Sequence, residues 1–180
     1  WERKLHQGIK FTDVDARPVL DGGLIYVPSF DGALYAVAQK GGAIQWRFDA
    51  GGSKQVITDR TRIFLPSSDG HVYALQKDTG KVFWRFELDD GVPTQLLLTP
   101  QHVIVASSFQ YLYVLDRTTG EGLYRFNVGH GNGFSSAPVL DESSGRLHLL
   151  SGGGNLYTFL LRQPPRRIRP LGALDPYVFF

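Results

Sequence analysis

Apolar and polar residues alternate in two short runs within the stretch 68–86, SDGHVYALQKDTGKVFWRF. A period of two places successive side chains on opposite faces, which is the pattern of a β-strand. Asp69-Gly70 stand before the first run, Asp78-Thr79-Gly80 separate the two runs, and such residues favour tight turns. The stretch therefore predicts a β-hairpin.

The same hairpin pattern recurs along the chain. One copy, 30–48, lies 38 residues upstream; another, 109–126, lies 40 residues downstream; a fourth, 153–157, holds the first half alone, 44 residues further on. Each full copy has an aromatic residue in its first strand, a glycine at its turn and an aromatic residue in its second strand. These blade-motif residues are Tyr35, Gly42, Trp46, Tyr73, Gly80, Trp84, Tyr113, Gly120, Tyr124 and Tyr157.

Two further apolar runs precede each hairpin. The nearer runs are 24–27, 63–65, 103–106 and 147–150, and the shorter, more distant runs end at Leu20, Ile57, Leu98 and Leu140. Four strands in each repeat of about 40 residues are the signature of a β-propeller blade. We therefore predict an all-β fold, a β-propeller with four four-stranded blades over residues 1–160.

The repeat resembles a known motif. Ala74-Leu75, Thr79-Gly80 and Trp84 match the A-x-D-x-x-T-G-x-x-x-W pattern of the PQQ-like, or quinoprotein-type, propeller repeats. The chain departs from this pattern where Gln76 and Ala38 replace the aspartate and Gly41 replaces the threonine. The resemblance implies that the tryptophan docks between neighbouring blades, so Tyr124, in place of tryptophan, is expected to mark an altered junction.

The two ends of the chain fall outside the full repeats. Residues 1–8, WERKLHQG, resemble the stretch after Trp46, so Trp1, Arg3 and Leu5 are expected to lie in an outer strand that completes a fourth blade. Propellers have roughly four to eight blades, and PQQ-like rings usually have the larger numbers. We therefore expect a homodimer of two half-propellers forming an eight-bladed ring, with this strand donated to the partner; a closed four-bladed monomer is the alternative. Residues 161–180 form a Pro/Arg-rich tail, expected to wrap the rim or to dock on a partner.

Composition removes several classes of function. The 180 residues carry a net charge of +2, too small for a dedicated nucleic-acid binder, and no apolar run approaches the length of a membrane span, so direct membrane insertion is not expected. Methionine is absent, and we expect a trimmed chain whose targeting segment was removed. Cysteine is also absent, which excludes disulfides and the vicinal cysteine pair of many quinone-dependent alcohol dehydrogenases.

No group of residues points to catalysis. The acidic residues Asp31, Asp69, Asp78 and Asp116 fall at turns, where aspartate is expected for turn geometry. The five histidines have no metal-ligand spacing, and no serine lies in a nucleophile elbow. We predict no catalytic, cofactor-binding or metal-binding residues and no cofactor.

The preferred hypothesis is a non-catalytic protein-interaction scaffold. Among PQQ-like propellers the chain most resembles the BamB-type, non-catalytic propellers of outer-membrane assembly. This resemblance implies a periplasmic or outer-membrane-associated location, an envelope protein as partner and a role in outer-membrane protein assembly. The chain lacks the lipidation cysteine of that type. A PQQ- or small-ligand-binding enzyme and a sensor domain of a larger membrane protein remain the alternatives.

Overall fold

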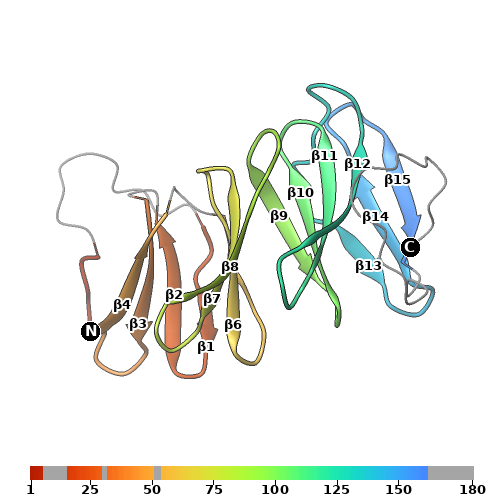
Figure 1. The fold of residues 1–180 in the computed structure, drawn as a ribbon. Coiled ribbons are helices and arrows are strands. Elements are labelled where there is room, and N and C mark those ends of the chain that lie inside the picture. The colour runs from red at the N-terminus through yellow and green to blue at the C-terminus, as the bar shows by residue number, and fades with distance from the viewer. Residues whose placement is uncertain (6–15, 30–31, 51–53, 162–180) are drawn as a thin grey trace. The chain divides into compact units, whose positions relative to one another are not determined.

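A computed structural model describes residues 1–5, 16–29, 32–50 and 54–161. The chain divides into two compact units, Trp1–Leu88 and Asp89–Phe180. The described residues form fifteen β-strands (Figure 1) and, within these ranges, no helix. The tail 162–180 and His6 lie outside the described residues.

The first unit contains two four-stranded antiparallel sheets, blade 1 and blade 2. Each follows the chain order of its strands, so neighbouring strands are joined by hairpins. Blade 1 consists of β1 (Val19–Asp21), β2 (Leu24–Ser29), β3 (Ala33–Ala38) and β4 (Ile44–Asp49). Blade 2 consists of β5 (Ile57–Thr58), β6 (Arg62–Pro66), β7 (His71–Gln76) and β8 (Val82–Glu87).

The second unit repeats this plan, but its last sheet has three described strands. Blade 3 consists of β9 (Pro93–Leu98), β10 (His102–Ser107), β11 (Tyr111–Asp116) and β12 (Gly122–Asn127). Blade 4 consists of β13 (Val139–Asp141), β14 (Arg146–Leu150) and β15 (Leu156–Leu160). All strand pairs are antiparallel.

The three full blades share one register. The second-strand aromatic lies opposite a small or β-branched residue, as in Ala36↔Trp46, Ala74↔Trp84 and Val114↔Tyr124. The register then shifts by one residue at the same place in each hairpin, directly after Ala36, Ala74 and Val114. A β-bulge at the same repeat position confirms that the blades are copies of one structural unit.

The inner strands are buried and the outer strands are half exposed. Strands β6, β7, β10 and β11 are almost fully buried along their lengths, whereas β4 and β8 alternate between exposed and less exposed residues. In each unit one apolar cluster spans both sheets: Leu34 with Leu65 and Leu75 in the first, and Ile104 with Phe134 and Leu147 in the second. The predicted all-β fold of propeller blades is confirmed.

Candidate functional site

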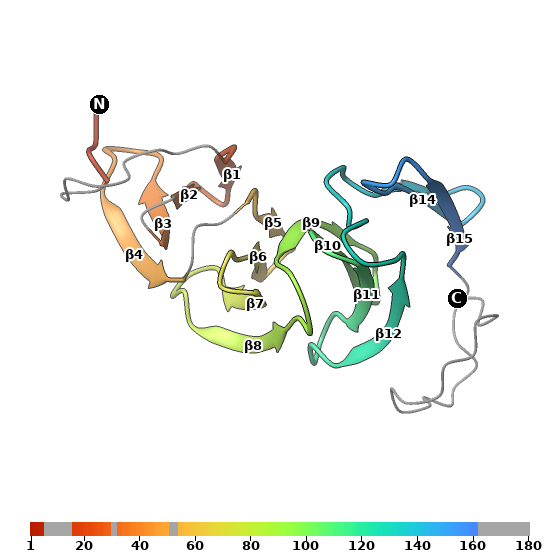
Figure 2. The ribbon, with the colours of Figure 1, turned by 90° about the horizontal axis from the view of Figure 1, so that it is seen from above.

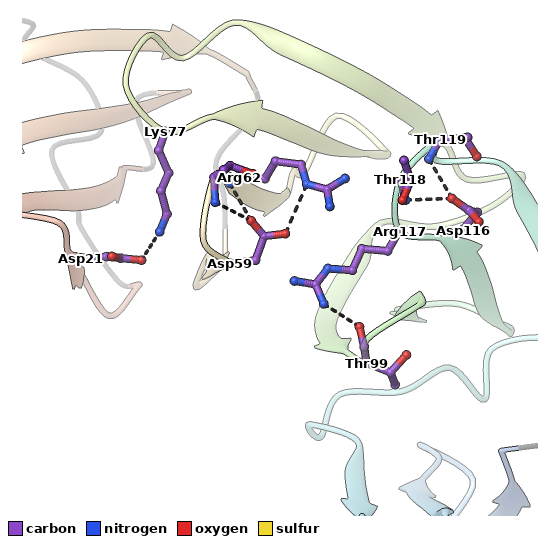
Figure 3. Close-up of polar contacts among 10 residues, drawn as sticks. Asp21, Asp59, Arg62, Lys77, Thr99, Asp116, Arg117, Thr118 and Thr119 are labelled. Atoms are coloured by element: carbon purple, nitrogen blue, oxygen red, sulfur yellow. Dashed lines mark hydrogen bonds and ion pairs between the residues drawn. The ribbon is translucent and has the colours of Figure 1, made fainter. Parts of the chain in front are cut away.

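The hairpin turn between the third and fourth strands explains the repeat motif. In blade 3, Asp116 Oδ1 accepts hydrogen bonds from the amides of Thr118 and Thr119, both at 2.8 Å (Figure 3). Although burial alone would raise the pKa of Asp116, the hydrogen bonds from Thr119 and Thr118 lower it. Gly120 closes the turn at φ 76°, a conformation that glycine adopts without strain.

The same turn in blade 2 receives the tryptophan of blade 1. Trp46 Nε1 donates a hydrogen bond to the carbonyl oxygen of Lys77 at 2.8 Å, and its ring lies over Gly80, where an added Cβ would come within 2.8 Å of Trp46 Cε3. Gly80 has φ 68°. The receiving site therefore consists of a backbone carbonyl and a glycine, and any larger residue in place of Gly80 would displace the indole.

A second aromatic contact joins the blades of each unit. Phe48 packs edge-on against Tyr73, with ring centroids 5.1 Å apart. In the other unit, Phe126 packs in the same way against Tyr157 and Phe159, at 5.6 Å and 5.1 Å. Such edge-to-face pairs stabilise by about 0.5–1.5 kcal/mol beyond the area they bury. The phenylalanine of an outer strand therefore acts as a second anchor on the next blade.

The repeated tyrosines are buried beside the hairpin loops. Tyr73 donates to Asp69 Oδ2 at 2.7 Å, and Tyr113 Oη accepts a hydrogen bond from the amide of Asp89 at 3.1 Å. Burial, with the hydrogen bond to Asp69, raises the pKa of Tyr73 to about 12, and burial raises the pKa of Tyr113 to about 12 as well. These tyrosines therefore stay neutral at ordinary pH and tie a loop to the sheet.

A polar contact between blades 1 and 2 was not predicted from the sequence. Lys77 Nζ donates to Asp21 Oδ2 across the two sheets (Figure 3). The hydrogen bonds from Lys77 and then from Thr58 lower the pKa of the Asp21 carboxyl below its ordinary value of 3.8. Lys77 also offers the carbonyl on which Trp46 docks, so this residue joins the blades through both its side chain and its backbone.

The lowered pKa of Asp21 predicts a pH dependence of stability. A carboxylate with a lowered pKa in the folded state stabilises the fold above its unfolded pKa, and this stabilisation is lost as pH falls through the folded pKa. Asp21→Asn is therefore expected to destabilise the protein at pH 7, with the difference from the wild type shrinking as pH falls below 3.8. Urea denaturation at several pH values measures this difference.

Asp49→Asn provides the matched control for that experiment. Asp49 forms an ion pair with Arg47 at 2.7 Å, but its side chain is 74% exposed, and exposed ion pairs contribute little to stability. Its replacement should change the free energy of unfolding by less than about 0.5 kcal/mol at any pH. A difference for Asp21→Asn that stays constant down to pH 2 would contradict the role of the Asp21–Lys77 contact.

Trp1 docks on blade 1 in the way Trp46 docks on blade 2. Trp1 Nε1 donates to the carbonyl oxygen of Gln39 at 3.0 Å, and an added Cβ on Gly42 would lie 2.3 Å from Trp1 Cε3. Arg3 Nε donates to the Gly42 carbonyl at 2.8 Å, and Leu5 packs on the cluster around Tyr35. Trp1–Leu5 form no strand with the described residues, so the expected strand pairing of Trp1, Arg3 and Leu5 stays a prediction.

The outer edge of blade 4 is open in the described part of the chain. The outermost strands of blades 1, 2 and 3 are β4, β8 and β12. In blade 4 the outermost described strand is β15, which is the third strand of its sheet (Figure 2). Leu156 is 68% exposed, while its equivalents in the other blades, Leu34, Val72 and Leu112, are 0% exposed. Leu34 and Leu112 are buried in the clusters that their blades share with the next blade, so the exposure of Leu156 marks a face of blade 4 that no described sheet covers.

A close approach between the backbones of Gly133 and Ser108, inside the second unit, was also not predicted from the sequence. The loop 129–134 crosses the turn at Ser108 so closely that a Cβ on Gly133 would lie 2.2 Å from the Ser108 carbonyl carbon. The crossing seats Phe134, whose amide donates to the Ser107 carbonyl at 2.7 Å and whose side chain is 1% exposed. Gly133 is not part of the repeat motif, so no sequence pattern indicates its role. The contact depends on how two separate loops meet in the fold.

The described residues contain no group of three or more His, Cys, Asp or Glu side chains that could hold a metal ion. Within the same described ranges, no helix has the length and apolarity needed to cross a membrane. The features that stand out in the described residues are thus the contacts between blades and the edge of β15, which pairs only with β14 there.

The repeated sheets and their tryptophan–glycine contacts define the class: a protein of PQQ-like β-propeller repeats. A family profile described as outer membrane protein assembly factor BamB matches residues 1–86 and 30–163. The chain belongs to this family, which confirms the resemblance drawn from the motif. No curated protein matches the chain at a significant level.

Several solved structures share the fold. BamB from Moraxella catarrhalis is 20% identical with a TM-score of 0.66; the match covers 77% of this chain and 43% of that one, so this chain spans less than half the length of that protein. The computationally designed Ika4 protein is 14% identical with a TM-score of 0.70, and 87% of this chain matches 100% of that one. Quinohemoprotein alcohol dehydrogenase from Comamonas testosteroni is 16% identical with a TM-score of 0.68, covering 78% of this chain and 29% of that one.

Proposed function

We propose that this protein is a non-catalytic, BamB-like protein-interaction scaffold of the cell envelope that takes part in outer-membrane protein assembly. The observation that carries the proposal is the family match, which extends over residues 1–163. Rigid sheets linked by short loops suit this role because they present variable loops and edges on a fixed support. The expected location is the periplasm or the inner side of the outer membrane.

Affinity capture from a cell-envelope extract tests this role. The chain should enrich components of the outer-membrane β-barrel assembly machinery at least tenfold over a bait of the same fold. The designed Ika4 protein provides that matched bait because its whole length shares the fold. Equal capture by both baits would contradict a specific scaffold function.

We also propose that two copies associate as half-propellers. The support is the edge of β15, which pairs only with β14 among the described residues, because an exposed strand edge is normally paired or covered in stable soluble proteins, and a two-fold pair protects the edges of both copies at once. Light scattering at micromolar concentration should give twice the chain mass of 20.1 kDa. A monomer mass would contradict the homodimer.

The enzyme alternative makes a different prediction. The fold is shared with a quinohemoprotein alcohol dehydrogenase, so PQQ with Ca²⁺ is the ligand to test. A ligand at 100 times its Kd stabilises by about 2.7 kcal/mol, which corresponds to a Tm increase of about 5–10 °C for a chain of this size. We expect a shift below about 1 °C in a thermal melt. A saturable increase would contradict the non-catalytic proposal.

A further inference from the structure

The outer strand of blade 2 exposes more apolar surface than the outer strands of blades 1 and 3. On β8, Val82 is 47% and Phe83 is 56% exposed. Phe83 is the extra residue of the β-bulge, because Trp84 and Val82 pair with consecutive residues of β7. The corresponding two positions are Ile44-Gln45 in blade 1 and Gly122-Leu123 in blade 3. Of the three full blades, blade 2 therefore presents two adjacent large apolar side chains here.

The arginine that follows the motif aromatic of the outer strand is also left without an ion pair in blade 2. In blades 1 and 3 this arginine is paired with an aspartate: Arg47 with Asp49 at 2.7 Å, and Arg125 with Asp89. The equivalent Arg85 is exposed and forms no ion pair with a described residue, and the same holds for Lys81. Two cations without partner charges therefore flank Phe83 in the sequence.

The backbone of β8 is open on one side. β8 is the last strand of its sheet and pairs only with β7 among the described strands (Figure 2). The amide of Leu88 donates to the Gly70 carbonyl at 2.9 Å, and in an antiparallel pair every second residue makes such bonds to its neighbour. The amides and carbonyls of Arg85 and Glu87 therefore point away from β7, toward the open edge.

These three features coincide on one strand. We infer that the edge of β8 binds an extended, acidic segment of a partner protein, which adds to blade 2 as a fifth strand. The edge supplies main-chain hydrogen bonds, and alternate side chains supply the specificity. A carboxylate directly opposite Arg85 neutralises that side chain, and Lys81 adds to the preference for negative charge. The inference rests on the proposed scaffold function and names the chemistry of one partner segment.

Glu87 limits the acidic stretch of that segment. Its side chain is 79% exposed and lies 4.0 Å from His71 Nε2, and like charges directly opposite each other on paired strands are destabilising. The partner residue opposite Glu87 is therefore neutral or basic. In the antiparallel orientation, the preferred segment reads lysine, threonine, glutamate, threonine and valine, opposite residues 87 to 83. This order places the glutamate opposite Arg85 and the valine opposite Phe83.

Fluorescence anisotropy of labelled synthetic peptides tests the site. The acidic probe has about nine residues, within the usual length of a strand, with that order at its centre and threonine at both ends. A comparison peptide has lysine in place of the glutamate, and the acidic probe should bind saturably and at least tenfold more tightly. A third peptide has proline in place of the two threonines beside the glutamate, which keeps the charge but removes ladder hydrogen bonds. It should bind at least tenfold more weakly than the acidic probe, and equal binding would overturn strand addition.

Two arginine variants provide the matched comparison on the protein. Arg85→Glu should weaken binding of the acidic probe at least tenfold, because it replaces attraction by repulsion. Arg47→Glu, at the same place in blade 1, should change binding less than twofold. Phe83→Thr should weaken it at least threefold. All three positions are exposed, and circular dichroism verifies that each variant is folded. Equal effects of the two arginine variants would overturn the inference.

The remaining outcomes separate this site from the scaffold function. If the wild-type chain captures assembly components from an envelope extract but does not bind the acidic probe, the scaffold function stands and the β8 site is overturned. If the chain captures none of them but binds the probe through Arg85, the β8 site stands and the proposed function is overturned. Binding of phosphatidylglycerol vesicles without saturable binding of the probe would identify a lipid-facing surface and would also overturn the inference.

Discussion

Trp46→Ala is expected to lower the free energy of unfolding by about 3 kcal/mol. Truncation of a core tryptophan costs about 3–5 kcal/mol, and Trp46 is half-buried, so the lower end applies. The change removes the hydrogen bond to the Lys77 carbonyl at 2.8 Å and the contact with the Tyr26 ring, whose centroid lies 5.9 Å away. Denaturation in guanidinium chloride, followed by circular dichroism, gives the value.

Two glycine substitutions control for this effect. Gly80→Ala places a methyl group within 2.8 Å of the Trp46 ring, whereas Gly41→Ala meets nothing within 4 Å, and both glycines have positive φ, 68° and 80°. Gly41→Ala should cost about 1 kcal/mol from backbone strain alone, and Gly80→Ala about 2–3 kcal/mol. In a Trp46→Ala background the two costs should become equal, because no indole remains to collide with. Additive effects of Trp46→Ala and Gly80→Ala would contradict the docking contact.

Gly133→Ala is expected to destabilise the second unit by about 3 kcal/mol or more. The added Cβ would lie 2.2 Å from the Ser108 carbonyl carbon and 2.4 Å from the Phe109 amide nitrogen. These are backbone atoms, which cannot rotate away as the end of a side chain can, so the loop must lift and withdraw Phe134 from the core. Overpacking of this kind costs about 1–3 kcal/mol and at times more.

Gly131→Ala is the matched control in the same loop. Its Cβ would meet nothing within 4 Å, and its φ of 72° leaves only the strain of the left-handed conformation, about 1 kcal/mol. Thermal and chemical denaturation of both variants give the comparison. Similar losses for Gly131→Ala and Gly133→Ala would show that the crossing at Ser108 tolerates a side chain, contrary to the structure.

Much of the blade architecture could be predicted from the sequence because its signals are local. Alternation marks each strand, the glycine before Trp46 or Trp84 marks each hairpin turn, and repetition raises the significance of every copy. The runs 24–27, 63–65, 103–106 and 147–150 all lie within observed strands. The pattern also indicated that the fourth copy holds only the first half of its hairpin, in agreement with a sheet whose last described strand is β15.

The contacts between blades could not be predicted because they depend on how one sheet faces the next. Asp21 and Lys77 are 56 residues apart, and neither belongs to the repeat motif. Gly133 differs from the glycines around it only through the backbone that passes beside it. The contacts of Trp1 with Gln39 and Gly42 also depend on facing surfaces, so the sequence pattern alone did not indicate them.

The receiving site for each docked tryptophan consists of main-chain atoms and a residue without a side chain, as at Lys77 and Gly80. Apart from the glycine, such a site requires no particular side chain in the receiving turn. A duplicated gene segment would therefore encode a new module that fits its predecessor at once. Tandem duplication would therefore preserve the tryptophan contact between blades, while mutation can diversify the loops.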